Sequence, residues 1–454
     1  MQPEVSKVVA DFIDNRIADI QESISVDISD YAGTDVKRGL RNADGTGVMA
    51  GITRIGDVRG YQLVDGVRKP VRGQLVYRGI DVEKLIDGFM GEGRFGFEET
   101  AYLLLFGKLP DSASLKVFQD ILAEYRTLPD GFTEDMILSA PSMDIMNKLA
   151  RSVLALYSYD PSPELTDLRS ELDKALHLIA RCPVIVAHAF AAKRHYFDKE
   201  SLVIHRPQDD LSTAENFLHI VRQDSSFTQG EAQLLDLCLV LHAEHGGGNN
   251  SAFACRVLSS AGTDIYSSIA AAVGSLKGPK HGGANKKVIE MFQCIEEGVK
   301  DWEDDEEIIS FLQRILRREA GCGDGLVYGF GHAIYTLSDP RAVRLRDLAA
   351  KLARGTPHEA EFNLFASVER LIPEAFQREG RSPADMCVNV DFYSGFVYKM
   401  LGIPDELYTP LFAIARMVGW CAHRIEEVFN QSRIIRPAYK TIAPDTDFVP
   451  LRNR

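Results

Sequence analysis

Three histidines and one aspartate in the C-terminal half of the chain can move protons, and each stands beside glycines or small residues. They are His245 in HAEHGGGNNSAF, His281 in GPKHGGAN, His332 in GFGHAIY and Asp391 in VNVDFYSG. Three arginines that can bind carboxylates lie in the same half, namely Arg341 in SDPR, Arg416 in AIAR and Arg436 in IIRP. Together these residue types could hold a polycarboxylate and move a proton at a carbon next to a carbonyl.

The surroundings of His245 leave two interpretations open. It follows a helical pattern and precedes a run of glycines and asparagines. Such a break lets the backbone approach a ligand closely, but it is equally typical of a helix C-cap with a surface histidine. A metal site with His242 is disfavoured, because zinc-binding helices usually place two histidines four residues apart and need a third ligand.

His281 lies before GGAN, where the pattern predicts the start of a helix. The N–H groups of such a helix would keep the imidazole neutral and make it a hydrogen-bond donor to a carbonyl oxygen. The alternative is an exposed histidine in a Gly-Pro turn. The glycine-rich turn at residues 329–332 is weak evidence for phosphate binding, since no strand precedes it, although its amides could contact a flat ring.

Asp391 and Arg416 both lie among apolar residues. Partial burial would raise the pKa of Asp391 and make it a better base, whereas the alternative is a cap on the following helix. A buried Arg416 needs an anion, unless its side chain reaches out to solvent. Arg341 precedes a predicted helix and could make a two-pronged contact with a carboxylate.

The elements that must position these residues are mainly helices. Apolar residues recur at helical spacing from Val5 to Ile24, and Thr228 with Glu231 predicts a capping box. Thr409 and Pro410 predict the start of another helix, and the acidic run at 301–307 predicts a solvated helix start. Residues 32–80 predict turns and one or two small hairpins. Strand patterns are too few for a doubly wound sheet.

Composition narrows the class of protein. The chain has 454 residues and a net charge of −14, so neither nucleic acid nor an anionic membrane is an expected partner. The N-terminus does not resemble a signal peptide, and we expect no membrane-spanning helix because no apolar run approaches about 20 residues. The 7 cysteines are scattered, which favours reduced thiols and a cytoplasmic location over a disulfide framework or zinc site.

Seven runs in order resemble the citrate synthase family. They are LVYRGIDVEKL, FEETAYLLLFGKLP, HAEHGGGNNSAF, GPKHGGAN, GFGHAIYTLSDPR, NVDFYSG and the AR…RP pair, and they span roughly residues 50–445. The resemblance implies a mainly α, two-domain fold that works as a homodimer. It places a large helical domain at 1–285 and 396–454, and a smaller helical domain at 286–395 that closes over the active site.

The resemblance also implies the reaction, a condensation of acetyl-CoA with oxaloacetate and water that gives citrate and CoA in the tricarboxylic acid cycle. Asp391 would remove the methyl proton of acetyl-CoA. His281 would donate a hydrogen bond to the thioester oxygen, and His332 would polarise and protonate the ketone of oxaloacetate. No cofactor and no metal are implied, since acetyl-CoA is a substrate.

The remaining implied contacts bind the two substrates. His245, Arg341 and Arg416 would hold oxaloacetate, and Arg436 would reach the site from the partner subunit. The CoA adenine would bind to the backbone of Val327, Tyr328, Gly329, Phe330 and Gly331.

The chain departs from the family pattern in two places. It reads HAEHG where many relatives read HADHE, and AIYTLS stands where many relatives carry basic residues, which leaves the CoA phosphate contacts open. A 2-methylcitrate synthase that uses propionyl-CoA stays a candidate, because one methylene is worth only about 1–3 kcal/mol in a pocket. A citrate-synthase-like binding protein without turnover is disfavoured, because a binding module needs no base.

Overall fold

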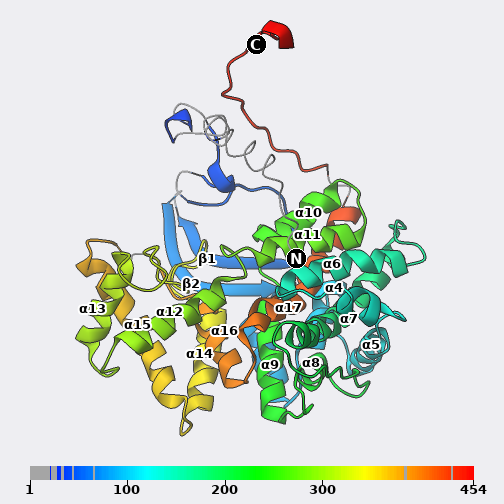
Figure 1. Cartoon of the computed structure of the whole chain (residues 1–454), viewed down its shortest axis with the longest axis horizontal. Coiled ribbons are helices and arrows are strands. Elements are labelled where there is room, and N and C mark those ends of the chain that lie inside the picture. The colour runs from blue at the N-terminus through cyan, green and yellow to red at the C-terminus, as the bar shows by residue number, and fades with distance from the viewer. Residues whose placement is uncertain are drawn as a thin grey trace. The chain divides into compact units, whose positions relative to one another are not determined.

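A computed structural model describes residues 21, 28–31, 35–42, 45–64, 67–382, 386–430 and 433–453 (Figure 1). The chain divides into two compact units, and each is treated by itself. One comprises Met1–Met49 with Arg436–Arg454, and the other comprises Ala50–Ile435. The predicted boundaries of a large and a small domain stay a prediction.

The unit that contains both chain ends has short turns in its described residues. Single turns of 3₁₀ helix span Ile28–Tyr31, Arg38–Leu40 and Leu451–Asn453. Arg41 pairs with Gly47 in an isolated antiparallel bridge. The amphipathic helix predicted from Val5 to Ile24 lies almost entirely outside the described residues.

The unit Ala50–Ile435 is mostly helical. Its earlier helices are α3 (Val82–Gly91), α4 (Phe97–Phe106), α5 (Ser112–Tyr125), α6 (Ile145–Leu156), α7 (Leu168–Tyr196), α8 (Thr213–Val221), α9 (Gln229–His242), α10 (Asn250–Ser260) and α11 (Ile265–Lys277). Its later helices are α12 (Ala284–Gly298), α13 (Asp305–Leu316), α14 (Pro340–Ala353), α15 (Glu359–Arg378), α16 (Val390–Met400) and α17 (Tyr408–Phe429).

Short polar side chains define where many of these helices begin. Asp111 accepts a hydrogen bond from the Ser114 amide at 2.7 Å, and Asp304 caps the acidic first turn of α13. Thr228 and Glu231 form the predicted capping box, so that prediction is confirmed. The prediction for Thr409 is wrong: α17 begins at Tyr408, and the Thr409 hydroxyl instead donates to the Gly282 carbonyl at 3.1 Å.

A small antiparallel sheet confirms the predicted hairpins. Strand β1 (Gly56–Val64) pairs with β2 (Val67–Tyr77), which pairs with β3 (Ile80–Asp81). Two glycines of this sheet let the chain around residues 334–340 pack directly on it. A Cβ at Gly60 would lie 2.3 Å from the Ile334 carbonyl oxygen, and one at Gly73 would lie 2.0 Å from that of Ser338. The sheet therefore supports the segment that carries His332 and Arg341.

The helices of this unit gather on two sides of β1 and β2. Figure 1 shows α13, α14 and α15 on the left and α5, α7 and α8 on the right. Helix α17 packs on α4, α7, α9, α10 and α11, and most of its residues are buried. This central position explains why its polar residues, including Arg416, are enclosed by protein.

Helix α7 corrects the expectation about apolar runs. By length and composition it is long and apolar enough to span a membrane, so the expectation that no apolar run approaches this length is wrong. Within the structure, 83% of its most apolar window is buried. Core helices of soluble proteins pass the same test, so the helix is weak evidence for a membrane span.

Candidate active site

The structure brings six of the predicted site residues together in the unit Ala50–Ile435. His245 lies between α9 and α10, and His281 precedes α12. The other four lie near the starts of α14 and α16 and within α17. The charges of Arg341, Arg416, His332 and His281 all act on His245. Arg436 belongs to the unit of the chain ends, where it is exposed.

His245 is buried, and its Nε2 has no hydrogen-bond partner among the described residues. Its ring meets the His332 ring edge-on, with centroids 5.2 Å apart. Burial, and then the nearby arginine charges, hold the pKa of His245 well below its usual value. The imidazole is therefore neutral, and no described side chain or backbone group bonds to its Nε2.

His332 has a defined tautomer when it is neutral. Its Nδ1 accepts hydrogen bonds from the amides of Ile334 and Tyr335, each at 3.0 Å. The ring also stacks on Tyr335 with centroids 4.6 Å apart. Because Nδ1 accepts, the ring proton of the neutral form is on Nε2, where it can be donated to a ligand.

His281 is kept neutral by its surroundings. Burial, and then the charge of Arg416, lower its pKa to about 4. Its Nε2 lies 3.0 Å from the Ser251 hydroxyl, which also accepts a hydrogen bond from Trp420 Nε1 at 3.1 Å. A helix does follow His281, but α12 begins at Ala284, within GGAN rather than after it, with Gly283 in the N-cap position.

Arg341 is buried against a carboxylate of its own segment. Its Nε donates to Asp339 Oδ1 at 3.0 Å and its Nη2 donates to Oδ2 at 2.7 Å. Asp339 also caps α14 and accepts from the Val390 amide at 3.1 Å, which ties the start of α14 to the start of α16. The guanidinium is thus rigidly oriented before any ligand arrives.

Arg416 is fully buried with much of its hydrogen-bonding capacity unused. Its Nε donates to the His242 carbonyl at 2.6 Å, but Nη1 and Nη2 have no hydrogen-bond partner among the described residues. Burial is the main reason why the pKa of Arg416 falls to about 10, although Glu244 acts to raise it. A buried guanidinium whose two terminal nitrogens bond to no described residue is a site for an anion such as a carboxylate.

Asp391 lies in the first turn of α16, but it is not the helix cap. Asn389 caps the helix and accepts a hydrogen bond from the Asp391 amide at 3.0 Å. The Asp391 Oδ1 is shielded from solvent and has no partner among the described residues. Burial raises the pKa of Asp391 to about 7, against the opposing charges of Arg341 and Arg416. The carboxyl is therefore poised to take or give a proton near neutral pH.

The turn 327–331 is fastened to the segment that leads into α16. The Gly331 amide donates to the Cys387 carbonyl at 2.8 Å, and the Asn389 amide donates to the Gly329 carbonyl at 2.8 Å. Asn389 Nδ2 also donates to the Gly331 carbonyl at 2.9 Å. Gly329 and Gly331 have φ values of 77° and 99°, which only glycine adopts easily. The turn and Asp391 thus share one hydrogen-bonded support.

Several residues that shape the site were missed by sequence reasoning. Asp339, Tyr335, Ser251 and Glu244 are all buried next to a predicted site residue. Asp339 had a usable signal, since Asp-Pro is a typical helix start. The same holds for Asn249, which caps α10 beside Ser251 in the run Asn-Asn-Ser. Nothing in the sequence indicates that Glu244 faces α17.

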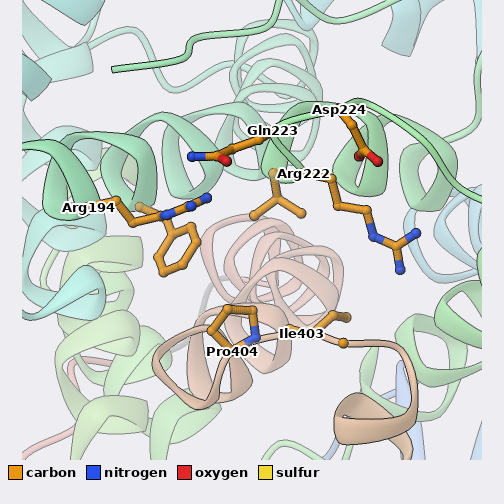
Figure 2. Close-up of a pocket in the computed structure, with 9 residues that line it drawn as sticks. Arg194, Arg222, Gln223, Asp224, Ile403 and Pro404 are labelled. Atoms are coloured by element: carbon orange, nitrogen blue, oxygen red, sulfur yellow. The ribbon is translucent and has the colours of Figure 1, made fainter. Parts of the chain in front are cut away.

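A separate cavity of about 420 Å³ opens between the end of α7, the residues after α8 and the turn after α16 (Figure 2). Phe190, Arg194, Arg222 and Ile403 line it, with other residues, and none of the predicted site residues does. Its two arginines are already engaged: Arg222 donates to Glu231 at 2.6 Å, and Arg194 pairs with Glu200. Within the described part of the chain, no three histidine, cysteine or acidic side chains gather as metal ligands.

Comparisons with known proteins place the chain among similar sequences and structures. A family model described as citrate synthase, C-terminal domain, matches residues 43–438. A citrate synthase of Synechocystis sp. is 35% identical over 413 residues, which are 90% of this chain and 92% of the relative. A 2-methylcitrate synthase of Shewanella oneidensis is 31% identical over 388 residues, which are 84% and 92% of the two chains.

A solved structure has the same fold. It is the ternary complex of Thermoplasma acidophilum citrate synthase with carboxymethyl coenzyme A and oxaloacetate. It matches with a TM-score of 0.75 at 28% identity, over 92% of this chain and 100% of that chain. The predicted mainly α, citrate-synthase-like fold is confirmed.

Proposed function

We propose that this chain, which belongs to the citrate synthase family, condenses acetyl-CoA with oxaloacetate and water to give citrate and CoA. Its relatives support either citrate synthase or 2-methylcitrate synthase activity. The observation that carries the proposal is the buried Asp391 carboxyl. Burial raises its pKa to about 7, and the nearby charges of Arg341 and Arg416 act to lower it. A base beside buried cations suits proton removal from a substrate that is bound next to an anion.

In the proposed first step, Asp391 takes a proton from the methyl carbon of the thioester, and the electron pair moves to the thioester oxygen. His281 donates a hydrogen bond to that oxygen and stabilises the resulting enolate. In the structure the Ser251 hydroxyl donates to Asn249 Oδ1 at 2.9 Å, so it accepts from His281 Nε2. For His281 to donate from Nδ1 to the thioester oxygen, the Ser251 hydroxyl must turn to Nε2 and the ring proton must move to Nδ1.

In the second step, the enolate carbon attacks the ketone carbon of oxaloacetate. His332 Nε2 donates its proton to the ketone oxygen, which becomes the hydroxyl of citryl-CoA. Water then cleaves the thioester and releases CoA, and the proton taken by Asp391 replaces the one that His332 gave, so both groups are restored. The two amide bonds to Nδ1 support this role because they fix the ring proton on Nε2.

Charge balance supports a contribution from a second subunit. Arg341 is paired with Asp339, and Glu244 is the acidic group that most raises the pKa of Arg416. A dicarboxylate adds two negative charges to this nearly balanced pocket. We infer that the chain forms a homodimer in which the partner's Arg436 supplies a further positive charge, and that His245 donates a hydrogen bond to oxaloacetate.

The turn Val327–Gly331 suits the CoA adenine in this proposal. Its glycines keep the backbone accessible, and the hydrogen bonds to Cys387 and Asn389 hold it in one conformation. This fixed backbone edge can pair with the rim of a base without help from side chains.

The alternative substrate is propionyl-CoA, and it rests on the similarity to 2-methylcitrate synthases. CoA release with oxaloacetate should be measured for acetyl-CoA and propionyl-CoA and compared as kcat/KM. We expect a preference for acetyl-CoA and, in Asp391→Asn, a loss on the order of 10²-fold or more. A preference for propionyl-CoA would assign 2-methylcitrate synthesis. Absence of turnover with both would leave a binding protein.

A further inference from the structure

Glu244 is a fully buried acidic residue next to His245 with no role in the reaction described above. Its Oε1 accepts a hydrogen bond from the Gly246 amide at 2.5 Å and lies 2.9 Å from His423 Nε2. Its Oε2 is buried without any hydrogen-bond partner among the described residues. A buried carboxylate oxygen without a donor is costly, so the site must compensate it in another way.

Helix α17 presents one face to the segment that contains Glu244. Arg416, Gly419 and His423 are spaced three and four residues apart, so they lie on the same side of the helix. Arg416 Nε contacts the His242 carbonyl at 2.6 Å, and His423 contacts Glu244. Between them, a Cβ at Gly419 would lie 2.4 Å from Glu244 Oε2, so the carboxylate packs directly on this glycine. Glu244 and Arg416 therefore share one buried strip.

His423 bonds to Glu244 without adding a positive charge. Its Nδ1 lies 2.7 Å from Arg256 Nη2, and a guanidinium can only donate. Nδ1 must therefore accept, which leaves the ring proton on Nε2 for Glu244. The Arg256 charge is matched by Glu426 and by Glu427, the latter at 2.6 Å.

Arg416 is thus the cation that matches the charge of Glu244. Burial acts to raise the pKa of Glu244, whereas a charge on His423, the His423 hydrogen bond, the charge of Arg416 and the Gly246 amide act to lower it. With His423 neutral, Arg416 is the cation that remains among these groups. Glu244 in turn is the strongest of the groups that oppose the lowering of the Arg416 pKa by burial. The two groups stabilise each other's charged forms inside the protein.

We propose that Glu244 is a positioning residue that serves as the resident counter-charge of Arg416, so that the empty pocket is stable and the bound carboxylates are held only moderately tightly. This inference rests on the proposed function, in which Arg416 binds oxaloacetate. A substrate carboxylate that approaches Arg416 also meets the Glu244 charge, which weakens binding. Citrate carries one more carboxylate than oxaloacetate, so the same charge promotes product release.

The first test needs no substrate. Glu244→Gln keeps the shape of the side chain and leaves an oxygen that accepts from Gly246 and His423, but it removes the negative charge. We expect it to lower Tm, because Arg416 is left as a buried unmatched cation. Adding Arg416→Gln should recover much of the loss, so the double variant is more stable than the sum of the two single effects predicts. Additive losses would overturn the proposal.

The second test measures oxaloacetate binding by calorimetry and citrate inhibition by kinetics. Glu244→Gln should bind oxaloacetate about tenfold more tightly, with a lower KM, stronger citrate inhibition and a lower kcat. Glu244→Asp keeps the charge and should stay near the wild-type affinity. A residue that merely holds the His245 segment in place would weaken binding when changed, and that result would overturn the proposal.

Glu171→Gln is the matched control. Glu171 is also buried and is paired with Arg424 Nη2 at 2.9 Å, and Arg424 is an arginine of α17 outside the site. This variant should lower Tm without changing the oxaloacetate Kd. An equal gain in affinity there would show that Glu244 has no special role.

A further measurement covers the case in which Glu244→Gln does not fold. In Arg416→Gln the pKa of Glu244 rises, so ionisation of Glu244 costs stability as pH increases. Because Arg416 also lowers the pKa of Asp391, the comparison is made with Asp391→Asn present in both proteins. The Tm deficit caused by Arg416→Gln should then grow from about pH 4 to pH 7. A constant deficit would contradict the proposal. If wild type neither binds nor converts oxaloacetate, the proposed function fails, whereas the ligand-free coupling between Glu244 and Arg416 is still decided.

Discussion

The histidines of the site are kept as neutral donors by different local means. Burial together with nearby guanidinium groups lowers the pKa of His245 and of His281. Two backbone amides fix the proton position of His332. Burial, helped by the cations that hold an anion in this pocket, therefore keeps the imidazoles of His245 and His281 uncharged. Neutral imidazoles can donate hydrogen bonds to the charge that develops on substrate oxygens.

Asp391 should lower the stability of the protein as it ionises. Its folded pKa of about 7 lies above the ordinary value of 3.8, so the unfolded chain loses this proton at lower pH. Stability is therefore lost as pH rises from about 4 to 7, and the loss stays constant above that range. Asp391→Asn should raise the free energy of unfolding at pH 8 by roughly 1–3 kcal/mol and leave it nearly unchanged at pH 4.

Thermal unfolding of both proteins between pH 4 and pH 8 checks this prediction. Asp120→Asn, an exposed change on α5, serves as the control and should show no such trend. A stability gain of Asp391→Asn that does not depend on pH would show that Asp391 is not held protonated by burial.

At the scale of elements, the starts of α14 and α16 and the turn 327–331 form one connected support. Asp339 links the first turn of α14 to the Val390 amide, and Asn389 links the first turn of α16 to Gly331. Residues far apart in the sequence are thus fixed relative to each other by a few polar bonds. Because Asn389 caps the start of α16 and bonds to Gly331, it fixes the position of Asp391 in the first turn of that helix.

Asn389→Ala should therefore damage both stability and activity. It removes the α16 cap and the bond to Gly331, which should cost about 1 kcal/mol and lower kcat about tenfold because Asp391 is less well placed. Tm and kcat should be measured beside Asp111→Ala, which removes the cap of α5. We expect the control to lose stability only, and equal kcat losses would argue against the positional role.

Gly73→Ala tests the support that the sheet gives to the site. The added Cβ would lie 2.0 Å from the Ser338 carbonyl oxygen and 2.7 Å from the Tyr335 ring, so the segment before Arg341 must move. We expect a loss of about 1–3 kcal/mol in stability and a several-fold rise in the KM for oxaloacetate. Gly88→Ala on α3, where a Cβ meets nothing within 4 Å, should be neutral or stabilising. An unchanged KM in Gly73→Ala would count against the sheet as a support.

At the scale of the whole molecule, the sequence predicts the fold class and the residues that meet in the site better than it predicts their environment. Helical spacing and caps identify α4, α9 and α13, because these depend on neighbouring residues. The Thr409 prediction failed because apolar packing extends α17 past a good local cap. Glu244 could not be found, because its burial results from contacts with α17 across 179 residues of sequence.

Assembly of the proposed homodimer can be tested by mixing subunits. Asp391→Asn and Arg436→Gln should each be nearly inactive alone. If Arg436 acts on the partner's site, mixed dimers contain one site with both wild-type residues, and activity should return to about one quarter of wild type after statistical exchange. Denaturation and refolding of an equal mixture gives the measurement. Recovery no greater than the sum of the separately refolded variants would place Arg436 in its own subunit's site or outside any site.

The hydrogen bonds that join residues 329–331 to 387–390 have a consequence for isotope exchange. The amide hydrogens of Gly331 and Asn389 are each held by a carbonyl oxygen of the other segment. Neither of them can open to solvent alone without separating the two segments. In deuterated water they should exchange at one common rate, which reports how often the base and its neighbouring turn come apart.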